Sequence, residues 1–365
     1  MRVKLEDVCE RGTSSLMQKD IVDKNGKYPV YGASGRIGSM ETYQQEHQTV
    51  AVVKDGAGIG RTMLLPEKSS IIGTMQYLIP KNCIEPEYLY YAVKYMHLEK
   101  YFSGATIPHI YFRDYKTEEF NLHNKTEQQE IISTLKRVEA VISNRREQLA
   151  MLDELVKARF VEMFGDPISN PFGFKVKTLQ KMIDDGTIMY HLDGNHGSDY
   201  PRNEEFVECG VPYISANCIV HNDVNLKLAK HLTEERASKL RKGIAQNGDV
   251  LFAHNATVGP VAILYTDDEK VILGTSLTAY RCDKERMVPD YLKAYMQSEG
   301  FVCQYTKDMK QTTRNQVPIT AQRKFLFVIP PLSLQNQFAA FAAEVDKSKL
   351  FAELFAQNAC ILAEN

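Results

Sequence analysis

The sequence predicts a mixed α/β (α+β) fold in which two similar globular halves are each followed by a long helix. Residues 49–74 and 249–275 share one order: apolar strand, turn with a glycine, second apolar strand, then Gly-Thr. Two other segments carry apolar residues at helical spacing. The 365 residues are 44% hydrophobic, enough for two separate cores. We therefore expect two mixed α/β domains in a pseudo-twofold tandem repeat, joined by two long antiparallel coiled-coil helices.

The repeat extends along most of the chain. "RVKLEDVCERG" from residue 2 resembles "KVKTLQKMIDDG" from residue 175, and "EPEYLYYAVKYM" (85–96) resembles "VPDYLKAYMQSE" (288–299). Residues 106–131 then align with residues 313–338. Self-similarity of this kind defines the domain plan. It predicts globular domains at residues 1–125 and 171–332, a first helix with its linker at 126–170, and a second helix at 333–365.

The glycines after the first repeated strand raise the question of a nucleotide site. Gly56, Gly58 and Gly60 follow the apolar run 50–53, as in a phosphate-binding glycine loop. The second copy keeps only Gly259, and residues 62–65 have the pattern of a strand, whereas a phosphate loop is followed by a helix. The sequence therefore predicts a β-hairpin turn, with a loop that contacts a ligand directly as the lesser alternative.

The two helical segments carry a heptad-like apolar stripe. Apolar residues recur at spacings of 3 and 4 from Glu127 to Phe164, interrupted near Arg145, and again from Leu334 to Leu362. The stripes are predicted to bury each other in an antiparallel pair, although each could instead pack on its own globular half. A helix of this length extends for about 57 Å. The predicted seam residues are Ile131, Leu135, Val138, Ile142, Leu149, Leu152, Val156, Phe338, Phe341, Val345 and Phe355.

Several classes of protein are disfavoured by what the sequence lacks. Its seven cysteines are scattered without a C-x-x-C pair, which predicts buried free thiols in place of a zinc site or disulfide framework. There is no apolar run of about 18 residues and no signal-peptide pattern, so we expect a cytoplasmic protein. Amino-methyltransferase motifs, a Walker A loop and a metal-ligand cluster are also missing from the sequence.

A set of short motifs, in a fixed order, links the chain to a known family. They are "YPVYGASGRIG" (28–38), "DGAGIG", "IIGT", "KTEQQEI", "LVKARFVEMFGDP" (155–167), "GVPYIS" (210–215), "GDVLF" (248–252) and "IPPLSLQNQ" (329–337). Over nearly its whole length the chain resembles the specificity subunit of type I restriction-modification systems. It departs from the pattern at His123 and Asn124, which replace two prolines, and in the second helix, which reaches Asn365 without an "FGDP" counterpart.

The resemblance implies a DNA-binding subunit without catalytic activity. Each globular half would be a target recognition domain that binds one half of a bipartite, asymmetric double-stranded DNA sequence. The helices would set the spacing and dock two methyltransferase subunits, and motor-nuclease subunits would join them. No cofactor or metal is expected in this chain, whereas S-adenosylmethionine and ATP with Mg²⁺ are expected on the partners. The alternatives are a two-headed helical scaffold without DNA specificity and, less favoured, a stand-alone enzyme.

Charge is divided between the halves and the helices in a way that fits these roles. Residues 1–125 hold 16 basic and 15 acidic side chains, and residues 171–332 hold 20 and 19. The helical segments hold 6 and 8 (126–170) and 2 and 4 (333–365). The small positive excess favours DNA on the globular halves, and the negative excess favours protein partners on the helices.

Base recognition needs polar side chains on loops, and two equivalent loops, 103–114 and 310–318, provide them. Arg314 is the residue in the second loop with a planar fork suited to guanine. For any single residue, a solvated loop position is the alternative. The candidate DNA-binding residues are Ser34, Arg36, Lys54, Arg61, Thr106, His109, Arg113, Ser215, Asn217, His254, Asn255, Thr257, Thr312, Thr313, Arg314, Asn315 and Gln316. A catalytic role for His254 as a general base is disfavoured, because its counterpart in the first half is Lys54.

Overall fold

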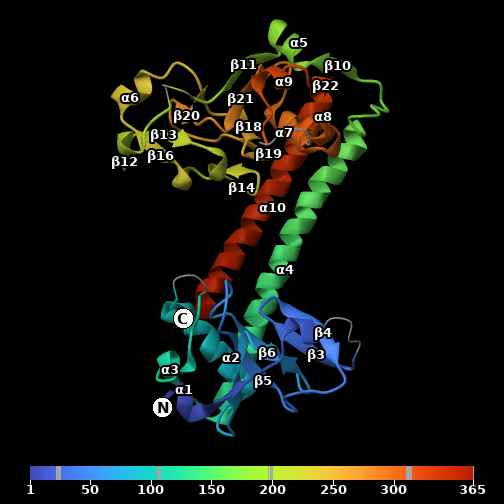
Figure 1. Cartoon of the computed structure of the whole chain (residues 1–365). Helices are drawn as coiled ribbons and strands as arrows, with labels where there is room; N and C mark the ends of the chain where they lie inside the picture. Colours follow the sequence, from blue (N-terminus) through green and yellow to red (C-terminus); the bar gives the residue numbers. More distant parts are fainter. Residues whose placement is uncertain (22–25, 105–107, 196, 198–199, 310–314, 365) are drawn as a thin grey trace. The chain divides into compact units, whose positions relative to one another are not determined.

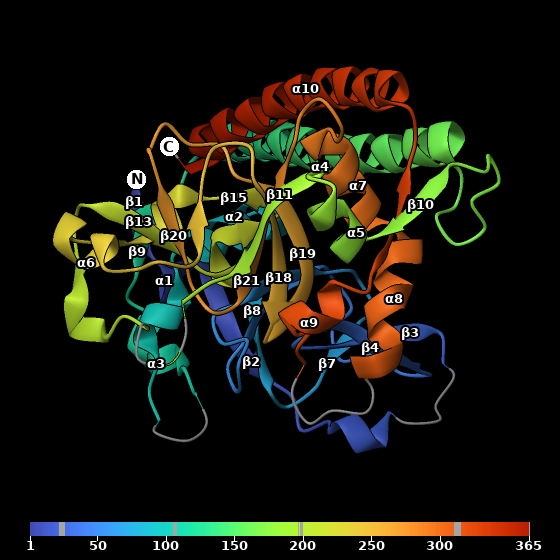
Figure 2. The ribbon, with the colours of Figure 1, turned by 90° about the horizontal axis from the view of Figure 1, so that it is seen from above.

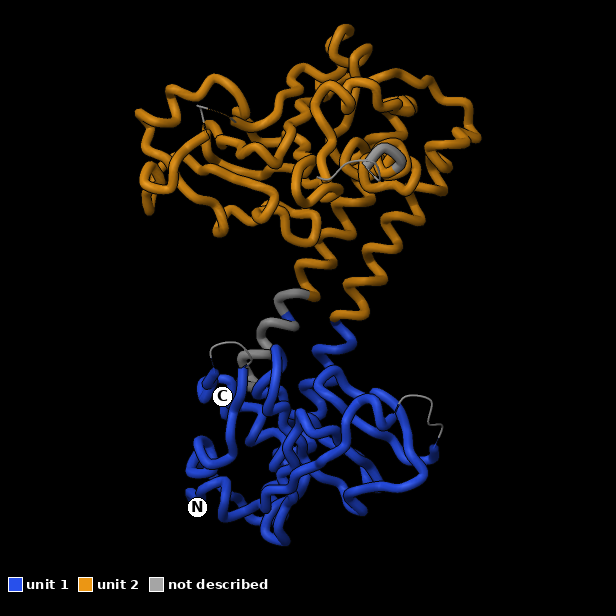
Figure 3. Tube along the Cα trace, in the orientation of Figure 1, with its two compact units in different colours: residues 1–145, 355–365 blue, residues 146–354 orange. Residues whose placement is uncertain are grey.

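The computed structural model of the chain divides into two compact units (Figure 3). Unit 1 comprises residues 1–145 and 355–365, and unit 2 comprises residues 146–354. The structure describes residues 1–21, 26–104, 108–195, 197, 200–309 and 315–364. Both divisions fall inside long helices, so the domain boundaries expected from the sequence stay a prediction.

Unit 1 is built on a four-stranded antiparallel sheet in the order β2-β8-β5-β6, beside a three-stranded sheet in the order β4-β3-β7 (Figure 1). The strand β1 pairs with β9, the last strand before the long helix. Its elements are β1 (Arg2–Lys4), α1 (Leu5–Val8), β2 (Cys9–Thr13), η1 (Gln18–Asp20), β3 (Tyr28–Gly32), β4 (Gly35–Met40), β5 (Thr49–Val53), β6 (Thr62–Leu65), β7 (Ser70–Ile71), β8 (Met75–Pro80), α2 (Pro86–Tyr95), η2 (Leu98–Tyr101), α3 (Phe112–Tyr115) and β9 (Glu119–Asn121).

Unit 2 repeats this plan with a larger second sheet. Its four-stranded sheet has the order β11-β21-β18-β19, which corresponds strand by strand to that of unit 1, and β10 pairs with β22 as β1 does with β9. The second sheet has five strands, β12-β16-β13-β20-β17 (Figure 2). The elements are β10 (Lys175–Thr178), α5 (Leu179–Asp184), β11 (Ile188–Asp193), η4 (Asn203–Glu205), β12 (Phe206–Val207), β13 (Val211–Ile214), η5 (Ala216–Cys218), β14 (Ile219–Val220), β15 (Asp223–Val224), η6 (Leu226–Leu228), β16 (Lys230–Leu232), α6 (Glu234–Ser238), β17 (Ile244–Ala245), β18 (Val250–Asn255), β19 (Thr257–Ile263), β20 (Val271–Leu273), β21 (Leu277–Cys282), α7 (Pro289–Gln297), α8 (Glu299–Met309), α9 (Ile319–Gln322) and β22 (Leu326–Ile329).

The central strands are buried on both faces, which explains their unbroken apolar sequences. In β5, Val50 and Val52 belong to the core cluster beneath α2, and Ala51 and Val53 belong to the cluster on the opposite face. In β18, Val250 and Phe252 pack toward α7, and Leu251 and Ala253 pack on the other side. The predicted hairpins are confirmed as β5–β6 and β18–β19.

The expected long helices are present as α4 (Lys125–Phe164) and α10 (Leu332–Glu364). A fully buried glutamine lies near the start of each. The Gln128 Oε1 atom accepts a hydrogen bond from the Glu85 amide at 2.8 Å, and Gln335 Oε1 accepts one from the Val288 amide at 2.9 Å. These glutamine side chains tie each long helix to the N-terminus of an earlier helix, α4 to α2 and α10 to α7. The repeat is therefore preserved in hydrogen bonding as well as in topology.

Within unit 2, residues 153–164 of α4 and 338–349 of α10 run antiparallel and side by side (Figures 1 and 2). The Phe338 ring lies 5.7 Å from the rings of both Phe160 and Phe164, and Lys349 forms an ion pair with Asp153 at 2.8 Å. The helix α4 ends at Gly165, whose φ of +71° is the left-handed conformation typical of a helix stop.

The predicted seam residues of α4 are each half-buried, namely Ile131, Leu135, Val138, Ile142, Leu149, Leu152 and Val156. On α10, Phe338 and Val345 are buried, and Phe341 is half-buried like the residues of α4. The small residue Ala342, next to Phe341, is buried as well.

An arginine of α4 lies against each of two predicted seam aromatics of α10. Arg159 is positioned over the half-buried Phe341 ring at 5.7 Å. Phe355 is 58% exposed, and the guanidinium of Arg145 lies 5.3 Å from its ring. In both contacts the positive guanidinium group lies over the face of the ring, which is the geometry of a cation–π interaction.

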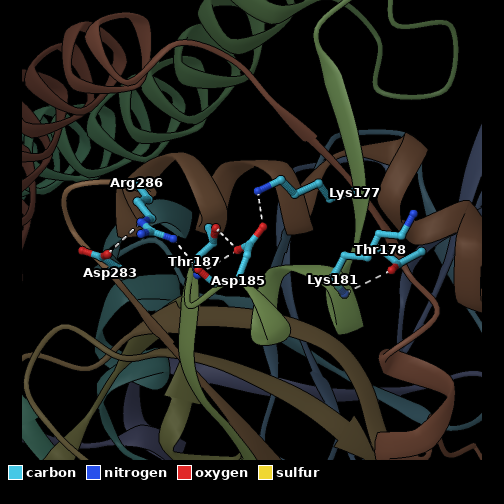
Figure 4. Close-up of polar contacts among 7 residues, drawn as sticks. All are labelled: Lys177, Thr178, Lys181, Asp185, Thr187, Asp283 and Arg286. Carbon is cyan, nitrogen blue, oxygen red and sulfur yellow. Dashed lines mark hydrogen bonds and ion pairs between the residues drawn. The ribbon is translucent and has the colours of Figure 1, made fainter.

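A charged cluster fixes the first helix of unit 2 (Figure 4). Lys177 and Thr187 point toward the Asp185 carboxylate, which accepts hydrogen bonds from both. Burial opposes ionisation, but these hydrogen bonds outweigh it and lower the pKa of Asp185 to about 2. Arg286 donates to the Asp185 carbonyl and pairs with Asp283 at 3.2 Å. The cluster thereby links the α5 end to the segment after β21.

The cysteines follow the prediction in part. Among the described side chains, Cys9, Cys218 and Cys282 are buried free thiols, and burial raises the pKa of Cys9 to about 12. Cys83, Cys209 and Cys303 are free but exposed, so the prediction of burial was wrong for these three. Position in a loop or on a helix surface decides their exposure, and scattered spacing carries no information about it.

Among the helices of the described ranges, none combines the length and the apolar character that a membrane crossing needs.

Candidate nucleic-acid interface

In unit 1, the turn after β5 pairs with the loop that precedes α3. The Gly56 amide donates to the Pro108 carbonyl at 3.0 Å, and the Ile110 amide donates to the Lys54 carbonyl at 2.9 Å. These bonds place Asp55 opposite His109 in an isolated antiparallel bridge. We call residues 54–56 and 108–110 the turn–loop bridge of unit 1.

Unit 2 forms the same structure from equivalent residues. The Ala256 amide donates to the Asn315 carbonyl at 3.0 Å, and the Val317 amide donates to the His254 carbonyl at 2.8 Å. Asn255 lies opposite Gln316 in the bridge. Residues 254–256 and 315–317 are the turn–loop bridge of unit 2. The last turn residue has a left-handed φ in both units, +93° at Gly56 and +63° at Ala256.

Charged side chains surround the bridge of unit 1. The Asp55 carboxylate pairs with Lys54 Nζ at 2.5 Å and with His109 Nδ1 at 2.7 Å. Partial burial disfavours its ionised form, but the hydrogen bonds from Lys54 and His109 outweigh burial and lower the pKa of Asp55. The His109 ring stacks on Tyr111 with centroids 6.3 Å apart, and the Arg113 guanidinium lies 4.8 Å from the Tyr111 ring. This edge therefore offers a carboxylate, cations and an aromatic face together.

The bridge of unit 2 is neutral on its outer side. Asn255 is half-buried, and Asn315 and Gln316 are exposed. His254, a candidate for base contact, is only 2% exposed, and its Nδ1 lies 3.2 Å from the Val317 carbonyl. Burial lowers the pKa of His254. The prediction of a DNA contact is corrected here, because the imidazole lies inside the unit and holds the loop from behind.

Three of the remaining candidates lie on two neighbouring turns of unit 1. Ser34 and Arg36 are exposed at the β3–β4 turn. Arg61, exposed between β5 and β6, donates from Nη1 to the Ala33 carbonyl at 2.8 Å and so joins the two turns.

In unit 2, Thr257 is exposed at the start of β19, directly after the bridge. Ser215 is half-buried and Asn217 exposed at the short helix η5, which follows β13. The strand β13 occupies in unit 2 the place of β3 in unit 1, since each pairs in parallel with the strand before Gly-Thr. The candidates Thr106, Thr312, Thr313 and Arg314 lie outside the described residues.

Sequence reasoning missed residues that belong to this site. Asp55 lies at the centre of the unit 1 bridge, and the alignment of "VVKDGAG" with "FAHNATV" already placed it opposite Asn255, a named candidate. Tyr111 follows His109 by two residues, which puts both on one side of an extended segment. Gln322, described below, gave no sequence signal, because an isolated glutamine in an amphiphilic segment is normally a surface residue.

The chemistry of these side chains suits base edges and phosphates. A carboxamide such as Asn255 or Gln316 can bind adenine through N6 and N7, and a carboxylate can accept from the cytosine amino group. Arginines such as Arg36 and Arg113 can bind guanine or phosphate. The two units thus present different hydrogen-bonding groups on the same backbone frame.

Part of the sequence is similar to known proteins. Residues 1–152 match the type I restriction modification DNA specificity domain. A stretch of 154 residues is 27% identical to the type I restriction enzyme MjaIX specificity subunit of Methanocaldococcus jannaschii, covering 39% of this chain and 36% of that relative. The matched family domain includes the unit 1 bridge.

Two solved structures have the same fold over the whole chain. The S subunit of a type I restriction-modification system from M. genitalium superposes with a TM-score of 0.60 at 15% identity, covering all of this chain and 94% of its own. A chain from a structural study of assembly and conformational transition in a type I system gives 0.57 at 16% identity, with coverages of 100% and 95%. Residues 1–152 are thus similar to a type I restriction modification DNA specificity domain, and the chain as a whole shares the fold of these two solved structures.

Proposed function

We propose that the chain is the DNA sequence-specificity subunit of a type I restriction-modification complex, in which each unit binds one half of a bipartite, asymmetric duplex target. The observation that carries this proposal is the turn–loop bridge, which has the same backbone bonds in both units but different outer side chains. A common frame supports a common role, and Asp55 with His109 against Asn255 with Gln316 suits two different half-sites.

We also propose that α4 and α10 dock two methyltransferase subunits, with motor-nuclease subunits joining that core. Exposed apolar residues on these helices support a protein partner, since such residues are enriched where surfaces become buried. They are Val141, Met151, Leu155 and Val161 on α4, and Leu350 and Phe351 on α10. On this proposal the chain itself is not an enzyme, the partners bind S-adenosylmethionine and ATP with Mg²⁺, and the complex acts on DNA in the cytoplasm.

An exchange of residues 1–125 for the corresponding part of a different specificity subunit tests the proposal. The complex with its methyltransferase subunits is assayed for methylation of a duplex library with randomised half-sites. One half of the preferred sequence should change while the other half is retained. A simultaneous change in both halves contradicts the assignment of one half-site to each unit. Binding without any sequence preference in the unaltered complex would support the scaffold alternative instead.

The long helices are proposed to set the number of base pairs between the half-sites. The half-buried Arg145 lies where the apolar stripe of α4 is interrupted. Four residues inserted after it keep the stripe nearly in phase and lengthen the helix by about 6 Å, close to two base pairs. The methylated sequence should then carry a spacer longer by one or two base pairs. A two-residue insertion rotates the stripe by about 200° and should weaken methyltransferase docking. An unchanged spacer in a fully active four-residue variant excludes this role for the helices.

A further inference from the structure

A buried polar cluster lies behind the turn–loop bridge of unit 2. It consists of Gln322 at the end of α9, Thr278 and Tyr280 on β21, His191 on β11 and His254 on β18. The first three are fully buried, and the two histidines are 6% and 2% exposed. A buried polar group costs free energy unless it is hydrogen-bonded, and among the described residues the atoms of this cluster without a partner are His191 Nδ1 and His254 Nε2.

The side-chain amide of Gln322 has all four of its hydrogen-bonding positions in use. Its Oε1 accepts from the Tyr280 hydroxyl at 2.7 Å and from His191 Nε2 at 3.2 Å. Its Nε2 donates to Thr278 Oγ1 at 3.0 Å and to the Val317 carbonyl at 3.0 Å. A flipped amide would place its oxygen against the Val317 carbonyl, which can only accept a hydrogen bond, so this contact fixes one orientation.

Val317 connects this amide to the recognition surface. Its carbonyl accepts from Gln322 Nε2 and also from His254 Nδ1, and its own amide donates to the His254 carbonyl. The residue directly before it is Gln316, an exposed member of the bridge. The position of Gln316 therefore depends on three hydrogen bonds made by its buried neighbour, one of which comes from Gln322.

We propose that Gln322 is a positioning residue that determines the base preference of unit 2 without contacting DNA. It holds Val317, and through Val317 it holds Asn315 and Gln316 against the turn that carries Asn255. The inference rests on the proposed function, because it assigns the discrimination between bases in one half-site to a residue in the interior of unit 2.

The equivalent positions of unit 1 lack this device. The bridge register places Tyr115 where unit 2 has Gln322, and β8 has Leu78 at the position of Tyr280. Tyr115 is fully buried, and within the part of the chain that the structure describes its hydroxyl makes no hydrogen bond. The effect of Gln322 should therefore be confined to the half-site of unit 2.

The test uses Gln322→Ala in the full chain, purified with its methyltransferase subunits, and a duplex library in which each half-site is varied in turn. Discrimination between matched and mismatched bases should fall about tenfold in the half-site of unit 2 and stay unchanged in that of unit 1. Amide hydrogen exchange should accelerate at Gln316 and Val317. Tyr280→Phe removes one bond to the amide and should act in the same direction with smaller size, which provides a milder variant if the alanine variant folds poorly.

Gln304→Ala is the matched control. Gln304 also lies in unit 2 and makes two backbone hydrogen bonds, both to Leu326, at 2.7 and 2.9 Å. The Gln304→Ala substitution should lower the melting temperature without relaxing base discrimination. The inference is overturned if Gln322→Ala keeps full discrimination, or if both alanine variants relax it equally at equal loss of melting temperature. An unaltered complex without any base preference overturns the proposed function as well, so the two failures are distinguishable.

Discussion

The two turn–loop bridges have the same backbone hydrogen bonds but are supported from opposite sides. In unit 1 the support lies near the surface, where Asp55 pairs with Lys54 and His109. In unit 2 it lies in the interior, where Gln322 and His254 bind the Val317 carbonyl. Ion pairs close to water are screened and weak, whereas buried hydrogen bonds are costly to break. The same backbone hydrogen bonds can thus be supported by surface ion pairs or by buried hydrogen bonds, and the two kinds of support differ in their sensitivity to salt, pH and mutation.

The largest expected difference between the units concerns the helix pair. Phe338 is 1% exposed and packs against two other phenylalanines, whereas Ile131, its counterpart on α4, is half-buried. Phe338→Ala should lower the free energy of unfolding of unit 2 by about 3–5 kcal/mol, and Ile131→Ala should affect unit 1 by less, about 1–2 kcal/mol. Urea unfolding followed by hydrogen exchange in each unit measures both.

Phe355→Ala is the control for that experiment, since it removes the same side chain from the same helix at a position that is 58% exposed. It should change stability by less than about 0.5 kcal/mol. A loss equal to that of Phe338→Ala would show that the exposed ring is buried in solution.

Acid should weaken unit 2 more than unit 1. Burial, aided by Arg323, lowers the pKa of His191 to about 4, although the Gln322 bond and Asp193 oppose the shift. The unfolded histidine has a pKa of about 6.5, so below that pH the unfolded state binds the proton more readily. The contribution of neutral His191 to the stability of unit 2 is therefore fully present above pH 6.5. It is lost as the pH falls toward 4, and the loss is at most about 3 kcal/mol.

Denaturation of the full chain at pH 7.5 and pH 5, with hydrogen exchange to separate the units, measures this loss. His191→Gln keeps a donor for Gln322 and should flatten the pH dependence of unit 2. Equal pH dependence in both units, or none in unit 2, would contradict the prediction.

A small effect on stability is expected from the surface charges of unit 1. Asp55→Asn leaves Lys54 and His109 without their carboxylate, and it should cost less than about 1 kcal/mol of stability. Affinity for random duplex should rise, and its dependence on salt should steepen by about one phosphate contact, because Lys54 becomes available to the backbone. Asp185→Asn, in the charged cluster of Figure 4, removes a similarly paired carboxylate away from the bridge and should leave the salt dependence unchanged.

The predictable part of the fold came from periodicity and repetition. The repeated strand–turn–strand order predicted both hairpins, and the alternation of 3 and 4 along α4 selected seven residues that are each half-buried. On α10 the same rule selected the half-buried Phe341, and it gave no sign that the small residue Ala342 beside it is buried. The larger second sheet of unit 2 has no counterpart in the repeat and could not be inferred from it.

The sequence allowed the exposed residues of the candidate site to be predicted, but not the buried residues that support them. Asn255, Gln316 and His109 were named from loop position and residue type, and the structure brings His109 to the bridge of unit 1 and the other two to that of unit 2. His254 was misplaced because a polar residue after an apolar run is usually exposed, and its burial depends on a partner 63 residues away, Val317. Interior polar clusters are fixed by tertiary contacts, which no local pattern encodes.

Among the residues that the structure describes, a Cβ added at Gly56 in the unit 1 turn would meet no atom within 4 Å, although its φ of +93° strains any residue other than glycine. The bonds that close both bridges run between main-chain atoms, so they survive a change of side chain at the outward positions. Over evolutionary time, substitutions there can accumulate without loss of the folded state. A lineage could therefore acquire a new target through a few point mutations in one unit while the other keeps its ancestral preference, and inherited recognition would diversify one half at a time.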